Sequence, residues 1–243
     1  MVEIECRHIG KRFQTNRGCV EPLKDVTLTL PAGQITALIG ESGCGKTTLL
    51  RIIAGLEQAG SGKLIMTPAQ DTEGRVPRVA VVFQEPRLFA WMSVYQNIEI
   101  AVRDLPPDER RSRVEKILAL VGLTQAAQAF PSELSGGMAQ RVGLARALVL
   151  EPDVLLLDEA FSALDALTRM RLYKEFIRIH ETRPMTVLLI THDVTEAVLL
   201  SKQVYKLCQG RVASHFSVPF DYPRSLSTPG VSEMSDLILK EFL

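Results

Sequence analysis

The sequence has no net charge to attract a polyanionic partner, because 28 lysine and arginine side chains balance 28 aspartate and glutamate side chains in 243 residues. Proteins that coat nucleic acid usually carry a clear positive excess, so we expect no nucleic-acid partner. A long apolar run is also missing: the longest, at residues 117–123, falls well short of the roughly 18 residues of a membrane-spanning helix. The first ten residues include Glu3, Glu5 and Arg7 and lack the apolar region of a signal peptide.

Cysteine is scarce, and the four cysteines, Cys6, Cys19, Cys44 and Cys208, form no CxxC pair. We therefore expect neither a disulfide framework nor a structural zinc site, and the pattern is typical of a reducing cytosol. The sequence also has no internal repeat and no low-complexity segment. What it does have is an ordinary globular composition, with 46% hydrophobic and 23% charged residues. At this length we expect one large domain over residues 1–243.

Apolar runs of strand length alternate with longer helical patterns, which predicts an α/β fold with a largely parallel sheet. Strands are expected at residues 35–39, 79–83, 154–157 and 187–190. The last two are nearly continuous aliphatic runs, which indicates burial on both faces of the sheet.

Three segments depart from this alternation. Val26, Leu28 and Leu30 alternate with threonines before a Pro-Ala-Gly turn, which predicts an antiparallel β portion at the N-terminus. A helical subdomain is expected at about residues 87–150, set between two strands of the core. Beyond Gly210 the pattern weakens, so a short C-terminal tail at about residues 212–243 is expected to be irregular and closed by a helix.

Residues 40–47 read Gly-Glu-Ser-Gly-Cys-Gly-Lys-Thr and fit the pattern GxxxxGK[ST] between a predicted strand and a predicted helix. The glycines let the backbone bend so that N–H groups point at an anion, and the following helix adds its positive end. Lys46 can reach the β and γ phosphates of a nucleotide, while the Thr47 hydroxyl can ligate Mg²⁺. A glycine-rich turn that contains Lys-Thr by chance is the alternative, and the flanking elements argue against it.

Asp158 and Glu159 follow directly on the predicted strand at residues 154–157. They stand at its carboxyl end, where open α/β sheets bind their ligands. Asp158 is suited to holding Mg²⁺, commonly through a water, and Glu159 to positioning the attacking water. Asp-Glu after a strand can also be the start of a helix, but after a phosphate loop it indicates the second half of a nucleotide site.

Residues 134–141 read Leu-Ser-Gly-Gly-Met-Ala-Gln-Arg, and with this segment the sequence resembles the nucleotide-binding subunits of ABC transporters. The resemblance runs from about residue 2 to residue 211. It implies an α/β P-loop NTPase fold, the ABC ATPase core, with an N-terminal antiparallel β portion and an inserted helical subdomain. It also implies a head-to-tail homodimer in which the phosphate loop of one copy and the Ser-Gly-Gly segment of the other enclose each ATP.

The Ser-Gly-Gly segment precedes a helix expected from about Ala139, whose positive end would face the γ-phosphate. A small-residue turn before a helix is also an ordinary N-cap. The family usually has Gln where this sequence has Met138, and because the Ser-Gly-Gly core is intact we expect activity to be kept.

The resemblance assigns further roles one residue at a time. Phe13 stands where an aromatic side chain stacks on adenine, with Arg12 or Arg17 nearby, although a core phenylalanine is the alternative. Gln84 looks like the glutamine that contacts the metal and the water. Residues 162–165 resemble the loop that crosses to the partner copy. His192 looks like the histidine that reaches the γ-phosphate, although a lone histidine after a strand is more often a surface residue.

The implied chemistry is hydrolysis of ATP to ADP and phosphate with Mg²⁺ as cofactor. The catalytic residues expected from the resemblance are Glu159, His192, Gln84 and Lys46. The expected metal ligands are Thr47, Gln84 and Asp158. The expected ATP-binding residues are Phe13, Gly40, Ser42, Gly43, Cys44, Gly45, Lys46, Thr47, Thr48, Ser135, Gly136, Gly137 and Asp165.

Residues 87–98 are similar to the segment of the family that receives the membrane subunit, and Phe89, Trp91 and Met92 would suit an apolar contact. A subdomain core around the only tryptophan is the alternative. The tryptophan here and Met138 resemble most the importers of nitrate, sulfonates and taurine, whose relatives carry thiamine precursors. We therefore expect membrane permease subunits as partners, an extracytoplasmic solute-binding protein as an indirect partner, and a peripheral position on the cytoplasmic face of the membrane.

Other classes share these motifs. An ABC exporter subunit is the nearest alternative, because the same motifs serve either direction of transport. Soluble ABC ATPases of DNA repair or the ribosome usually carry tandem cassettes, a long coiled coil or zinc modules, none of which this sequence has. A P-loop kinase would not need the Ser-Gly-Gly signature.

Overall fold

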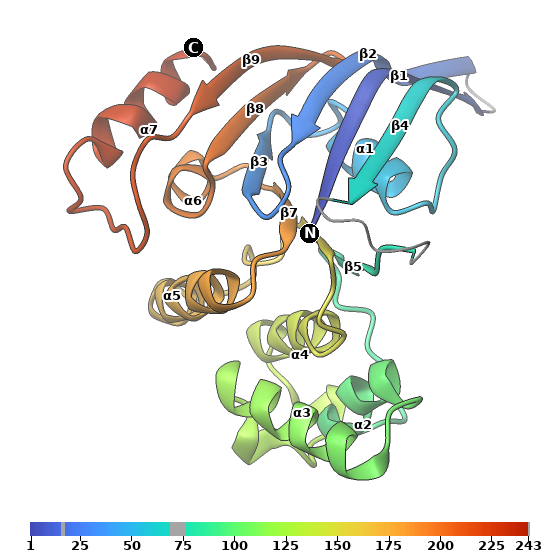
Figure 1. The fold of residues 1–243 in the computed structure, drawn as a ribbon, viewed down its shortest axis with the longest axis vertical. Coiled ribbons are helices and arrows are strands. Elements are labelled where there is room, and N and C mark those ends of the chain that lie inside the picture. The colour runs from blue at the N-terminus through green and yellow to red at the C-terminus, as the bar shows by residue number, and fades with distance from the viewer. Residues whose placement is uncertain (16–17, 69–75, 243) are drawn as a thin grey trace.

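The computed structural model describes residues 1–15, 18–68 and 76–242, and its fold is drawn in Figure 1. Arg17 therefore lies outside the described residues. The strands are β1 Val2–Thr15, β2 Gly18–Leu30, β3 Ile35–Ile39, β4 Ser61–Pro68, β5 Val79–Val82, β6 Val154–Asp158, β7 Thr186–Ile190, β8 Gln203–Cys208 and β9 Arg211–Ser217. The α-helices are α1 Lys46–Ile53, α2 Val94–Glu99, α3 Pro107–Leu120, α4 Gly136–Leu148, α5 Ala166–Thr182, α6 Val194–Leu200 and α7 Val231–Lys240.

The described strands form a sheet in the order β4-β1-β2-β9-β8-β3-β7-β6-β5. The strands from β8 to β5 pair in parallel. By contrast, β1 pairs antiparallel with β2 and β4, and β8 pairs antiparallel with β9. The largely parallel sheet and the antiparallel N-terminal portion predicted from the sequence are both confirmed.

The central strands are buried on both faces, as their aliphatic runs predict. Every residue of β3, β6 and β7 is buried, and neighbouring positions point into different hydrophobic clusters. Leu155 and Leu157 pack with α5 and α6, whereas Leu156 packs with α1 and the β1–β2 portion. Each fully buried leucine stabilises the fold by about 1.5–3 kcal/mol, so these strands make a firm base for the loops at their ends.

Between β5 and β6 the described elements are all helical, and they gather in the lower part of Figure 1. They pack around a separate cluster that includes Val94, Val114 and Val142. Helix α4 begins at Gly136 and not at about Ala139, because the Ser135 side chain accepts a hydrogen bond from the Met138 N–H and caps it there. Within the described residues no helix is both long and apolar enough to cross a membrane.

The C-terminal part differs from the irregular tail that we expected. Residues 211–217 form β9, a strand inside the sheet between β2 and β8. Its alternate residues are only half-buried, which explains the weak sequence pattern. The closing helix is present as α7, and its Val231 and Ile238 are fully buried against the core. The tail is therefore part of the packed domain.

Candidate functional site

The loop between β3 and α1 is shaped by glycines that no other residue could replace without strain. Gly40 and Gly45 have φ angles of 153° and 110°. A Cβ atom on Gly40 would lie 2.3 Å from the Leu207 carbonyl oxygen, and one on Gly45 would lie 2.3 Å from the Pro22 carbonyl oxygen. The sequence therefore bends here around neighbouring backbone, as the phosphate-loop pattern predicts.

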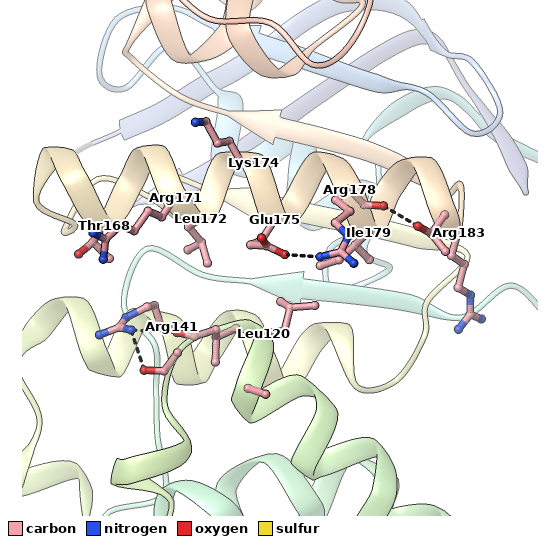
Figure 2. A pocket seen from close by; sticks show the side chains of 14 residues that line it. Leu120, Arg141, Thr168, Arg171, Leu172, Lys174, Glu175, Arg178, Ile179 and Arg183 are labelled. Atoms are coloured by element: carbon pink, nitrogen blue, oxygen red, sulfur yellow. Dashed lines mark hydrogen bonds and ion pairs between the residues drawn. The ribbon is translucent and has the colours of Figure 1, made fainter.

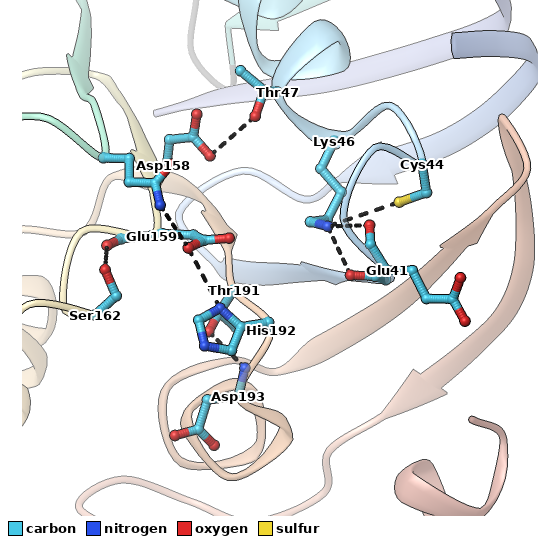
Figure 3. A network of polar contacts seen from close by, with 12 residues as sticks. Glu41, Cys44, Lys46, Thr47, Asp158, Glu159, Ser162, Thr191, His192 and Asp193 are labelled. Atoms are coloured by element: carbon cyan, nitrogen blue, oxygen red, sulfur yellow. Dashed lines mark hydrogen bonds and ion pairs between the residues drawn. The ribbon is translucent and has the colours of Figure 1, made fainter. Parts of the chain in front are cut away.

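Lys46 starts α1 and is almost fully buried, with 7% of its surface exposed. Its ammonium group turns back into the loop and donates to the carbonyl oxygens of Gly40 (2.7 Å) and Glu41 (2.8 Å), as Figure 3 shows. Its Nζ atom also lies 3.8 Å from the Cys44 Sγ atom. The loop thus holds a positive charge at its centre, next to the N-terminal end of a helix, and both attract phosphate.

Thr47 faces Asp158 across the site. The Thr47 hydroxyl donates to the Asp158 carboxylate at 3.4 Å, and Asp158 is only 6% exposed. Burial raises the pKa of the Asp158 carboxyl, while the Thr47 hydrogen bond and the charge of Lys46 oppose that rise. A carboxylate and a hydroxyl are oxygen ligands of the kind that Mg²⁺ binds together with phosphate oxygens and water.

Two further side chains converge on one carboxylate oxygen, Oε2 of Glu159. The Gln84 amide donates to it at 3.2 Å, and the His192 Nδ1 atom lies 3.4 Å from it. Glu159 has a φ of 47°, a conformation uncommon for a residue other than glycine, and its N–H donates to the Ile190 carbonyl oxygen at 3.0 Å. Such strained backbone is concentrated at functional sites.

These residues come from neighbouring strands. Strands β3, β7, β6 and β5 are adjacent and parallel, and the phosphate loop, His192, Asp158–Glu159 and Gln84 follow their carboxyl ends in that order. Figure 3 shows Lys46, Thr47, Asp158, Glu159 and His192 around one space. Parallel strands place such residues together at one edge of the sheet, where α/β proteins bind their ligands.

The loop at residues 162–165 leads directly away from Glu159. The Ser162 hydroxyl donates to the Glu159 carbonyl oxygen at 2.8 Å, and Asp165 caps α5 by accepting from the Thr168 N–H at 3.0 Å. That contact with Thr168 lowers the pKa of the Asp165 carboxyl. Both side chains are thus engaged in holding the loop.

The Ser-Gly-Gly segment lies in a different part of the molecule. Figure 1 shows α4 with the helices of the lower half, whereas α1 lies under β1, β2 and β4 in the upper half. Ser135 and Gly136 are exposed, and the nearest neighbour that a Cβ on Gly137 would meet is Leu164, at 3.3 Å. Met138 packs against the helical cluster, so its side chain fills space there.

Phe13 also stands apart from the Glu159 cluster. It lies on β1, is partly exposed, and has the Lys11 ammonium 5.0 Å from its ring centre. Arg12 is held in an ion pair with Glu21 at 2.7 Å. Phe13 is therefore only partly buried, and its stacking on adenine stays a prediction.

The sequence model of the family described as "ABC transporter" matches residues 23–162, more than half of the chain, including the phosphate loop and the Ser-Gly-Gly segment. The chain belongs to the ABC transporter family. An aliphatic sulfonates import ATP-binding protein of Pseudomonas fluorescens is 44% identical over 98% of this chain and 85% of that protein. A nitrate import ATP-binding protein of Synechococcus elongatus is 47% identical over 83% of this chain and 31% of that protein.

A solved structure described as the dimeric post-hydrolysis state of the ATP-binding cassette MJ0796, bound to ADP and Pi, superimposes with a TM-score of 0.80. It is 27% identical, and the match covers 90% of this chain and all of that one. These comparisons confirm the predicted ABC ATPase fold, ATP binding and ATPase activity of this cassette.

The buried residues that hold the turn around His192 were not predicted from the sequence. Glu196 is only 5% exposed, accepts a hydrogen bond from the Tyr173 hydroxyl at 2.8 Å, and also bonds the Thr191 side chain. Burial raises the pKa of the Glu196 carboxyl. The Thr191 hydroxyl in turn accepts from the Asp193 N–H at 3.0 Å, so this buried group fixes both neighbours of His192.

Arg169 adds a second support, between the loop at residues 162–165 and the turn that carries His192. It donates to the Leu164 carbonyl oxygen at 2.9 Å and lies 3.6 Å from the Asp193 carboxylate. Asp193 also caps α6 through the Glu196 N–H. An Asp followed three residues later by Glu is a helix-start signal, and it is the one sign in the sequence that pointed to this turn.

Proposed function

We propose that this cassette binds and hydrolyses ATP as the nucleotide-binding subunit of an ABC importer for a small solute. The observation that carries the proposal is the convergence of Gln84 and His192 on Glu159, beside the loop that holds Lys46. The import relatives support the direction of transport, since aliphatic sulfonates, sulfate and nitrate appear in their names. For this chain we infer a nitrate-, sulfonate- or taurine-like solute, or a thiamine-precursor-like one.

Each residue has a role that its position supports. Lys46 and the loop N–H groups, with Ser42, Gly43 and Thr48 among them, bind the phosphates. Glu159 and His192 hold the attacking water in line with the terminal phosphoryl group, and Gln84 orients Glu159. No covalent intermediate is required, so the gain comes from positioning and from charge stabilisation.

Mg²⁺ fits the donor set at this site. The Thr47 hydroxyl, the Asp158 carboxylate and the Gln84 amide offer oxygen atoms to a cation. Among the described residues, the buried Asp158 side chain accepts its one hydrogen bond from Thr47. The described residues contain no group of three or more His, Cys, Asp or Glu side chains that could bind a metal alone. This agrees with a cation that would be held mostly by phosphate oxygens and water. Such a cation would neutralise the negative charge that develops on the leaving group.

We further propose that two identical copies complete the site. Ser135 and Gly136 are exposed at the start of α4, in the opposite half of the molecule from α1, so the Ser-Gly-Gly segment of one copy faces the phosphate loop of the other. The solved relative is described as dimeric, which supports this arrangement. Asp165 and Phe13 would then line the ATP from the crossing loop and from the adenine side.

The contact with the permease is proposed at residues 87–98. Trp91 is 72% exposed, whereas Phe89 and Met92 are half-buried beside it, which removes the alternative of a core around the tryptophan. The segment is firmly anchored, because the buried Asn97 donates to the carbonyl oxygens of Phe89 and Met92. A rigid exposed aromatic side chain is what an interface hot spot requires. The cassette would then sit peripherally on the cytoplasmic face of the membrane.

Replacement of Glu159 tests the proposal. In Glu159→Gln we expect hydrolysis to fall at least about 100-fold while ATP still binds, because a water-positioning base is lost and the phosphate loop is untouched. The variant should accumulate as an ATP-bound dimer in size-exclusion chromatography with light scattering. Glu233→Gln, an exposed carboxylate in the first turn of α7, is the control and should match the parent. A monomer at saturating ATP, or unchanged hydrolysis, would refute the proposal.

Replacement of Trp91 tests the partner. In Trp91→Ala we expect ATP hydrolysis by the isolated cassette to stay within about twofold, while co-purification with the permease falls at least tenfold, as for a lost hot spot. Leu226→Ala removes another exposed apolar side chain, 58% exposed, and should retain the permease. Recovery of a permease together with an extracytoplasmic solute-binding protein would support import. A permease without such a protein would favour the exporter alternative, and nucleic acid or ribosomes would contradict both.

A further inference from the structure

A cleft of about 900 Å³ separates α5 from the end of α3 and the α4 helix. Figure 2 shows α5 on one side and Arg141 and Leu120 on the other. None of the residues that line this cleft belongs to the ATP site described above. Its size is that of pockets that enclose small organic molecules.

The lining is strongly cationic in a chain that has no net charge. It contains five arginine or lysine side chains and one acidic side chain, Glu175. Glu175 lies 3.7 Å from Arg178, and Glu151, outside the cleft, forms an ion pair with Arg183, so both of these arginines are compensated. Arg171 is exposed on α5 and has no ion pair or hydrogen bond among the described residues.

Arg141 faces Arg171 from the opposite wall. Its Nη1 donates to the carbonyl oxygens of Val121 (2.9 Å) and Gly122 (3.2 Å), at the end of α3. Its Nε is buried and makes no hydrogen bond to any residue that the structure describes. The Asp165 carboxylate interacts electrostatically with Arg141 and partly compensates its charge. Arg171 is therefore the uncompensated cation at this end of the cleft.

Apart from Thr168 and Thr182, the rest of the lining is apolar. In Figure 2, Leu172 and Leu120 continue the two walls beside the Arg141–Arg171 end, and Ile179 lies further along α5. Leu172 is buried in the core, whereas Leu120 and Ile179 are half-buried. An oxyanion at the arginines and a hydrocarbon body along Leu120 and Ile179 would both find matching surface.

We propose that this cleft binds a small organic anion that joins one oxyanion head, such as a sulfonate, phosphate or carboxylate, to an apolar body. The head lies between Arg141 and Arg171, and the body lies along Leu120 and Ile179, which are half-buried apolar side chains of the two walls. Because the cleft lies between α5 and the helical subdomain, one bound molecule contacts both. The inference does not depend on the proposed transport function.

Titration calorimetry with 1-heptanesulfonate tests this site, since its charge does not titrate and its chain is apolar. The intact cassette is saturated with a non-hydrolysable ATP analogue, so that the phosphate loop cannot bind the probe. We expect one saturable site per chain, with affinity at least tenfold above that for inorganic sulfate or 1-heptanol. Arg171→Glu should weaken binding at least tenfold.

Lys63→Glu is the matched control, because it makes the same charge change at an exposed lysine on β4 that does not line the cleft. It should change the affinity less than about threefold, a small fraction of the effect of a direct charged contact. Circular dichroism melting of each variant shows that it is folded. The proposal is overturned by the absence of saturable binding, by sulfate binding as tightly as heptanesulfonate, or by equal losses in the two variants.

Discussion

The two surfaces that would enclose ATP are built in different ways. The phosphate-loop surface stands on buried parallel strands, and its side chains already contact one another: Lys46 bonds its own loop, Thr47 bonds Asp158, and Glu159 is met by two side chains. The Ser-Gly-Gly surface is the exposed start of a helix, and outside this helix no described residue lies within 4 Å of a Cβ placed on Gly136.

The difference teaches which surface is complete within one chain. Buried strand ends fix their loops by packing, so the phosphate-loop surface is preorganised by the fold. The free N–H groups at a helix start contribute to binding only when an anion is brought within hydrogen-bond distance of them. The first surface should therefore control ATP affinity, and the second should control hydrolysis through assembly.

The largest expected effect separates these two surfaces. Lys46→Ala should lower ATP affinity strongly, because the loop loses its buried positive charge. Ser135→Arg should leave ATP affinity of the isolated chain within about threefold and reduce hydrolysis at least 100-fold, because it blocks the facing surface. Nucleotide titration and phosphate-release assays measure the two. Loss of ATP affinity in Ser135→Arg would break the comparison.

A smaller effect is expected on the phosphate-loop side, from the hydrogen bond that supports the turn carrying His192. Tyr173→Phe removes the hydroxyl that donates to the buried Glu196 carboxylate, which costs about 1–3 kcal/mol and loosens the turn that carries His192. We expect kcat to fall several-fold with little change in the KM for ATP. Tyr205→Phe, whose hydroxyl makes only 3.4 Å contacts, is the control. A lower melting temperature with unchanged kcat would show that Tyr173 supports only the fold.

The smallest effect concerns stability and pH. Burial raises the pKa of Asp158, so the folded protein binds this proton more tightly than the unfolded chain does. The stability that the protonated Asp158 carboxyl contributes is therefore lost as the pH rises from about 4, the value in the unfolded chain, through the raised pKa of the folded state. Asp158→Asn should melt higher than the parent at neutral pH, without ATP, and the difference should vanish towards pH 3. A lower melting temperature at neutral pH would contradict this assignment.

Much of the fold was predictable because its central elements have recognisable local sequence patterns. The aliphatic runs of β6 and β7 and the Gly-Lys-Thr loop carry their own signals. The start of α4 was placed late because Gly136 and Gly137 are poor helix formers, and only the Ser135 cap, seen in the structure, shows that the helix begins there. Strand β9 was missed because its half-buried alternation depends on neighbours far along the chain.

The candidate site was predictable to a similar depth. The residues proposed to contact the nucleotide lie in short motifs, so Lys46, Glu159 and His192 could be named from the sequence. Their supports could not, because burial of Glu196 under Tyr173 is decided by the packing of α5 against α6. A carboxylate in a helix pattern otherwise reads as exposed.

The most direct test of the shared site is a mixing experiment. Lys46→Ala chains and Ser135→Arg chains are each inactive alone, but a mixed dimer pairs the intact loop of one with the intact Ser-Gly-Gly segment of the other. Random pairing of a symmetric dimer then restores up to about a quarter of parental hydrolysis if each site works alone. Recovery well above either variant is the predicted result. No recovery, when cross-linking shows that mixed dimers form, would contradict a site built from two copies.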